Sequence, residues 1–210
     1  MADQLCTTGQ VKNRLQNAAA GVTFSATDTT TIGELIDQVS DWVQHYTGRK
    51  FVPDNAATYV MDTTAGYTLR IPRGIRTVTS MGINILTHQP DTGGSYTTLS
   101  AATILLRPST ADLPVGWPPT EVRLSRATTS VFATVENGAT ITGNFGFATT
   151  PPDIAAVTID AVVAAFQTRK MGASGVIGAE GDAVVPWVSF FSRGSPQRGT
   201  LDRYRYQAIG

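Results

Sequence analysis

The stretch ITGNFGFATTPPDI, residues 141–154, changes character at its midpoint. In its first half Ile141, Phe145 and Phe147, with Gly143 between them, lie at alternate positions, which is the period of a strand that packs one face against a core. In its second half a threonine pair can cap a helix, Pro151 and Pro152 suit a first helical turn, and Asp153 favours the positive end of the helix dipole. The stretch therefore predicts a strand that leads directly into a helix.

Upstream of this stretch the chain begins with two predicted helices. A short helix capped near Thr7 or Thr8 precedes a longer one with a clear helical pattern. Thr31 and Glu34 match a capping box at the start of the longer helix, and Gly48 supplies a stop after its last turn. Its apolar face consists of residues at three- and four-residue spacing, namely Ile32, Leu35, Ile36, Val39, Trp42, Val43 and Tyr46.

Residues 56–147 are predicted to form a compact antiparallel β unit. Short runs with strand-like composition are separated by turns rich in glycine and proline. Asn137 and Gly138, which lie between two such runs, are typical of a hairpin turn. The predicted strands are residues 67–71, 76–83, 96–106, 121–124, 131–135 and 140–147.

A third helix is predicted for residues 151–171, and it is apolar nearly all round. Such a helix must be covered on more than one side, which makes it a central helix. Glycines then recur every third residue from Gly172 to Gly181, which favours a mobile loop. The C-terminal arm, residues 187–210, is rich in aromatic residues and arginine and is expected to end in a short helix, residues 201–206.

Composition argues against catalysis and against binding of nucleic acid by bulk charge. Sixteen basic residues balance sixteen acidic ones, and the chain has two isolated histidines, His45 and His88. We therefore expect no enzyme, no cofactor and no metal site. The single cysteine, Cys6, excludes an intramolecular disulfide, and no apolar run reaches membrane-spanning length, so we expect a protein made in the cytoplasm without membrane contact.

Three arginines cluster around one predicted turn, Arg70, Arg73 and Arg76. They could contact DNA phosphates or another subunit. The neutral total charge favours a solvated turn or a protein contact over DNA.

The order of several short motifs resembles the head-tail connector, or adaptor, family of tailed bacteriophages. These motifs are HYTGRKF (45–51), LRIPRGIRTVTSM (69–81), the opening stretch, QTRKMG (167–172) and LDRYRY (201–206). The resemblance implies an α+β fold in which a small helical bundle carries a large antiparallel β insertion and a C-terminal arm. Its expected parts are a helical region 1–55, the β insertion 56–147, a central helix 148–171 that completes the bundle, and a flexible loop and arm 172–210.

The resemblance also implies structural roles for particular residues. One group ends the second helix and turns the chain into the sheet, and another joins the sheet to the third helix. The first group is Gly48, Arg49 and Phe51, and the second is Phe145, Gly146, Phe147, Pro151 and Pro152.

The function implied by the resemblance is structural. Members form a ring beneath the portal protein, with twelve copies expected here, in the neck of the virion. The ring extends a channel through which DNA passes without sequence-specific binding, and its far side receives a stopper or tail-completion protein. The virion neck is thus the expected location, after synthesis in the host cytoplasm.

The arm has the residue types that carry binding energy in interfaces, and we expect it to anchor the ring to portal. The alternative is that it packs on its own subunit as a fourth helix. The expected portal-binding residues are Trp187, Phe190, Phe191, Arg193, Arg198, Arg203, Tyr204, Arg205 and Tyr206.

Two other functions remain open from the sequence. One is a different neck or tail-completion protein, which would dock on the tail without affinity for portal. The other is a β-rich module that binds carbohydrate or a host surface as a monomer, which the threonines, tyrosines and Trp117 suggest.

Overall fold

A computed structural model describes residues 3–18, 23–84, 96–114, 116–126, 130–173 and 190–205. The chain divides into two compact units. We call Met1–Gly48 together with Thr150–Gly210 the helical unit, and Arg49–Thr149 the β unit. The fold is α+β with antiparallel sheets, which confirms the fold class expected from the sequence at that level.

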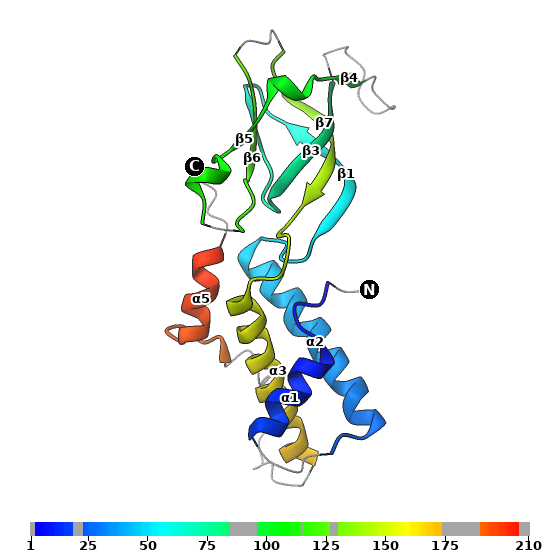
Figure 1. Ribbon diagram of the computed structural model, residues 1–210, viewed down its shortest axis with the longest axis vertical. Helices are drawn as coiled ribbons and strands as arrows, with labels where there is room; N and C mark the ends of the chain where they lie inside the picture. The colour runs from blue at the N-terminus through cyan, green and yellow to red at the C-terminus, as the bar shows by residue number, and fades with distance from the viewer. Residues whose placement is uncertain are drawn as a thin grey trace. The chain divides into compact units, whose positions relative to one another are not determined.

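The described part of the helical unit contains α1 (Thr8–Ala18), α2 (Ala26–Thr47), α3 (Pro152–Ala173) and α5 (Pro196–Tyr204). The central element is α3, which contacts the other three helices (Figure 1). Buried residues such as Ile154 and Val162 face these contacts. The prediction that this apolar helix is covered on more than one side is therefore confirmed, and its cover comes from its own chain.

The start of α2 differs from the sequence prediction. Ser25 caps the helix by accepting from the Asp28 amide at 3.0 Å, and the Asp28 carboxylate accepts from the Ser25 amide at 2.9 Å. Thr31 and Glu34 match the same motif but lie inside the helix, because the earlier box already satisfies the first free amides. The predicted stop at Gly48 is confirmed, since this residue has φ 67° and donates to the His45 carbonyl.

The described part of the β unit contains two sheets. One has the order β1-β7-β3-β4 and the other β2-β6-β5, and all pairs are antiparallel. Their inward residues, including Ile75 and Ile141 from one sheet and Val122 and Leu124 from the other, pack into one core. The strands are β1 (Asp54–Thr63), β2 (Thr68–Arg70), β3 (Ile75–Asn84), β4 (Tyr96–Thr98), β5 (Ile104–Arg107), β6 (Glu121–Leu124) and β7 (Val135–Phe145).

The hairpin predicted at Asn137 and Gly138 is wrong. Both residues lie inside β7, where Asn137 has φ 53° and the pairing with β1 shifts register. The chain continues because the residues around this point pair with β1 and β3 and not with each other. Asn137 and Gly138 thus form a bulge. A bulge, like a hairpin turn, often contains a residue with positive φ.

Two other strand predictions also need correction, and one strand in the predicted β region was not named. The run 131–135 is not a strand, because only an isolated bridge joins Phe132 to Gly66 before β7 begins. The run 96–106 is broken by a short 3-10 helix, Ala101–Thr103. Strand β1 was not among the predicted runs, although it forms an edge of the larger sheet.

Candidate interaction surfaces

The C-terminal helix α5 is held on α2 by a stack of aromatic rings. Trp42 lies between Tyr46, at a centroid distance of 5.1 Å, and Phe191, at 4.4 Å, and both ring pairs are stacked. Phe191, just before α5, is buried, and Phe190 meets it edge to face at 5.3 Å. The apolar stripe of α2 therefore extends beyond the helical core and receives the C-terminal segment.

A polar network surrounds the outer end of this stack. The Tyr46 hydroxyl donates to Asp202 at 2.5 Å and accepts from Arg198 Nε at 3.1 Å. The guanidinium groups of Arg198 and Arg205 lie 5.4 and 5.6 Å from the Tyr46 ring centroid. Desolvation and the bond to Asp202 raise the pKa of the Tyr46 hydroxyl. The network holds the outward side of α5 on α2.

The inward side of α5 is anchored on α3. Leu201 is fully buried, and the buried Tyr204 donates to both carboxylate oxygens of Asp153, at 2.9 and 3.0 Å. Burial, followed by the neighbouring Asp153, raises the pKa of the Tyr204 hydroxyl. Asp153 therefore has two roles. Its negative charge suits the first turn of α3, and its carboxylate binds the Tyr204 hydroxyl of α5.

These contacts place the described part of the arm on its own chain, as in the fourth-helix alternative. Phe191, Arg198 and Tyr204 are all engaged there, so their predicted contact with portal requires α5 to leave its site. Phe190 is half-buried, whereas Arg193, Arg203 and Arg205 are exposed. Trp187 and Tyr206 lie outside the described residues, as do the glycines from Gly175 to Gly181.

The aromatic residues of the predicted junction are buried within the β unit. Phe147 lies 5.2 Å from Phe51 and 6.0 Å from Trp117, measured between ring centroids. Phe145 is fully buried and meets Tyr59 edge to face at 4.7 Å. These rings form a second aromatic cluster where the chain enters and leaves the β unit.

The other junction residues have positions that suit their types. Gly146 has φ 70°, and a Cβ there would lie 2.6 Å from the Val52 carbonyl oxygen, so only glycine fits. The Arg49 guanidinium lies over the Trp117 ring at 5.2 Å. Pro152 is the first residue of α3 and follows the half-buried Pro151, in agreement with the preference of proline for the first helical turn.

Arg70, Arg73 and Arg76 each have a separate partner within the β unit. Arg70 Nε lies 4.0 Å from Glu121, and Arg76 donates to the Asn55 side chain at 2.6 Å. Arg73 donates to the Tyr59 hydroxyl at 3.0 Å and lies over its ring. The structure does not gather them into one cationic cluster.

The Tyr59 hydroxyl that receives Arg73 belongs to a charged network. It donates to Asp54, which also forms an ion pair with Lys50 at 3.2 Å. The bond from Tyr59, and then Lys50, lower the pKa of the Asp54 carboxyl. Arg73 and Arg76 thus both bind side chains of β1, at the edge of the larger sheet.

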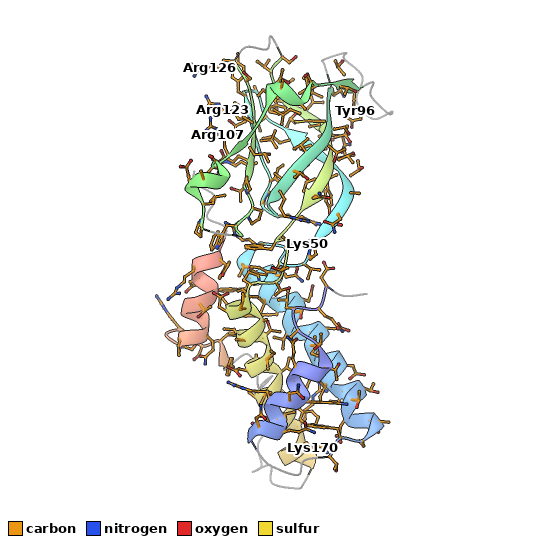
Figure 2. The ribbon with its side chains drawn as sticks, in the orientation of Figure 1. Lys50, Tyr96, Arg107, Arg123, Arg126 and Lys170 are labelled. Atoms are coloured by element: carbon orange, nitrogen blue, oxygen red, sulfur yellow. The ribbon has the colours of Figure 1, made fainter. Side chains whose placement is uncertain are left out.

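Three further arginines share an outer surface of the β unit. Figure 2 shows Arg107, Arg123 and Arg126 in a row along the side formed by β5 and β6. Arg107 is separated from Arg123 and Arg126 in the sequence, and only the pairing of β5 with β6 brings the three together. The alternation of Val122 and Leu124 with Arg123 was the available signal.

Among the described residues no group of histidine, cysteine, aspartate and glutamate could hold a metal ion. His45 is exposed on the last turn of α2, and His88 lies outside the described residues. Cys6 is buried, and burial raises the pKa of its thiol to about 12. Within the described parts of the chain, no helix is long and apolar enough to cross a membrane.

Comparison with known proteins gives a structural likeness only. No protein-family model and no curated protein matches the sequence. A chain in a solved structure described as the neck of an empty GTA particle computed with C6 symmetry matches with a TM-score of 0.57. That match has 14% identity and covers 97% of this chain and 90% of the other. A chain from the virion of a native gene transfer agent (GTA) particle matches with a TM-score of 0.48, 15% identity and 95% and 90% coverage. At 14% identity the first match shows that the two chains share a fold.

Proposed function

We propose that this chain is a structural protein of the neck of a phage-like particle and has no catalytic activity. The observation that carries the proposal is the likeness to a chain of a particle neck, which extends over nearly the whole of both chains. The resemblance of the ordered sequence motifs to head-tail connectors is an independent reason for the same function.

In this proposal the chain forms a ring beneath portal, extends the DNA channel without reading the DNA sequence, and offers its far side to a stopper or tail-completion protein. The likeness to a neck reconstruction with C6 symmetry is compatible with the expected twelve copies, because a twelve-fold ring also obeys six-fold symmetry. Two exposed arginines of the arm, Arg193 and Arg203, can reach an acidic portal surface without release of α5.

The first experiment is to mix the purified chain with purified portal and to measure co-sedimentation. Binding in a fixed ratio supports the proposal. Binding to tail components without affinity for portal would instead favour another neck or tail-completion protein. A chain that binds neither but binds glycans as a monomer would favour the carbohydrate module.

The role of the arm needs variants that keep α5 in place. Deletion of residues 187–210 removes the buried Phe191 and Tyr204 together with the exposed arginines, so it also exposes α2 and α3. The charge reversals Arg193→Glu and Arg203→Glu change exposed positions only. We expect these two changes together to weaken binding to portal, whereas Arg169→Glu, an exposed position on α3, leaves binding unchanged. Equal binding by all variants would remove the arm from the portal interface.

A further inference from the structure

The outer face of the smaller sheet carries a concentrated positive charge. By register, Arg70 lies opposite Glu121, which lies opposite Arg107, and in the next row Arg123 lies opposite Leu105. The other face of the same strands is buried in the core, so these side chains point outward. We call Arg70, Arg107 and Arg123, with Arg126 two residues after the end of β6, the arginine face. Figure 2 labels Arg107, Arg123 and Arg126.

Most of this charge is not used within the described parts of the chain. Arg107, Arg123 and Arg126 form no ion pair among the described residues, and Arg70 reaches Glu121 only at 4.0 Å. Leu105, which lies on β5 two residues before Arg107 and opposite Arg123, is 38% exposed. Arginines around an exposed leucine have the composition of a protein interface.

Glu121 argues against a DNA backbone as the occupant. It lies between Arg70 and Arg107, and a DNA strand presents negative charge continuously along its length. A partner with two separate carboxylates can instead face the two arginines without placing a third negative charge opposite Glu121. The spacing required is two strand separations, about 10 Å.

The chain itself carries a surface with this spacing. Glu34 and Asp41 are exposed on α2, on the side opposite its buried stripe of Ile32, Ile36 and Val43. Seven helical residues separate them by about 10 Å along the axis. Neither forms an ion pair among the described residues. Asp37, which lies between them, is half-buried and accepts from Gln4 at 2.9 Å. We call the two exposed carboxylates, Glu34 and Asp41, the acidic stripe.

The net charges of the two units are also opposite in sign. Arg49–Thr149 contains eight basic and six acidic residues, whereas the rest of the chain contains eight and ten. A ring is closed by head-to-tail contacts between two different surfaces of one chain. Opposite charges on those surfaces set the register of neighbouring copies.

From these observations we infer that the arginine face binds the acidic stripe of a neighbouring copy of this chain. The inference rests on the proposed ring and adds the contact that closes it. Arg70 and Arg107 face the two exposed carboxylates, and Leu105, beside Arg107 on β5, packs on the same helix.

The direct test replaces Leu105 with a photoreactive benzoylphenylalanine. Illumination of the purified full chain, and of cells that produce the particle, is followed by mass spectrometry of the products. We expect a cross-linked dimer that joins position 105 to a peptide containing residues 34–41. An intramolecular product, a dimer joined through another segment, or no dimer in either preparation would overturn the inference.

Charge reversal gives a second test. Arg70→Glu with Arg107→Glu, and separately Glu34→Lys with Asp41→Lys, should each lower the yield of the dimer roughly tenfold or more. A chain with all four changes has both surfaces reversed, and it should recover self-association but not join wild type. The matched control Arg169→Glu should leave the yield unchanged. Lack of recovery in a folded four-fold variant contradicts the inference.

Failure of the inference can be separated from failure of the proposed function. If the chain is found in the particle neck but position 105 never reaches α2 of another copy, the neck function stands and this contact is wrong. If reversal of Arg70 and Arg107 leaves the dimer intact but abolishes binding of a DNA duplex, the arginine face contacts phosphate and the inference is overturned. A chain absent from particle necks overturns the proposed function itself.

Discussion

The ring of Trp42 lies 4.4 Å from the ring of Phe191, with an angle of 18° between their planes. This stack joins residues 149 positions apart in the sequence. Because Trp42 also stacks on Tyr46, three rings form a continuous column along α2. The C-terminal segment is thereby part of the helical unit.

The first prediction concerns this column. Phe191→Ala removes a buried ring, for which typical costs are about 3–5 kcal/mol. Because α5 is a short helix of nine residues that side-chain contacts hold on α2 and α3, we expect the loss to release α5 locally before the whole unit unfolds. Hydrogen exchange of the amides in Pro196–Tyr204 should accelerate strongly. The half-buried Phe190→Ala serves as control with a smaller effect, and equal protection in both variants would contradict the stack as an anchor.

The second prediction concerns Tyr204. Tyr204→Phe removes the bonds to both Asp153 oxygens and should lower the free energy of unfolding by about 1.5–3 kcal/mol. Denaturant unfolding measures this loss. Tyr67→Phe, at a residue that is 39% exposed, should change stability by less than about 0.5 kcal/mol. A loss no larger than that of the control would show that the bonds to Asp153 are weak.

Tyr204 also gives stability a dependence on alkaline pH. The fold raises the pKa of its hydroxyl, so the protonated form is the one that stabilises the fold. That contribution is complete below the ordinary tyrosine pKa of about 10 and is lost as pH rises through the higher folded value. Tyr204→Phe should therefore lose less stability than wild type above pH 10.

The helices were largely predictable from the sequence because their signals are local. The buried face of α2 and the stop at Gly48 follow from spacing within one segment. The start of α2 could not be predicted in this way, because two possible capping boxes occur six residues apart in the sequence. The box at Ser25 is reinforced by a partner distant in the sequence, because Lys170 lies 2.9 Å from Asp28.

The β pairing and the candidate surfaces were less predictable because they depend on distant partners. Asn137 has the same local chemistry in a turn and in a bulge, and only β1 and β3 decide between them. Phe191 and Tyr204 are residue types that suit both an interface and a core, so sequence could not place them. The arginine face exists only once β5 pairs with β6.

The third prediction concerns the aromatic cluster of the β unit. Phe145→Ala and Phe147→Ala each remove a buried ring and should cost about 3–5 kcal/mol. The denaturant midpoint should fall, while Val131→Ala, at a side chain that is 47% exposed, should leave it nearly unchanged. Unchanged midpoints for both phenylalanine variants would show that these rings face a partner.

The fourth prediction concerns Asp28. The Lys170 side chain, and then the Ser25 amide, lower the pKa of this carboxyl to about 2. A lowered pKa contributes stability that is present above the ordinary value of about 3.9 and is lost as pH falls toward 2. An NMR titration of the Asp28 carboxyl should give a midpoint near 2. Lys170→Met should move it upward. A wild-type midpoint near 4 would contradict the ion pair.

The last prediction concerns Ala56, a residue with a side chain in a conformation that favours glycine. Its φ is 54°, next to a register shift in β1, and its amide donates to the Asn144 side chain at 3.0 Å. The left-handed conformation costs an L-residue about 1–2 kcal/mol. Glycine removes this cost but adds about 0.4–1 kcal/mol of unfolded-chain entropy. Ala56→Gly should therefore raise the free energy of unfolding by about 0.5–1 kcal/mol.

The adjacent Ala57 pairs with Gly143 and is not among the residues with positive φ, so Ala57→Gly should lower stability by a similar amount. Chemical denaturation of the two variants compares the signs, and destabilisation by both would mean that Ala56 is not strained in solution.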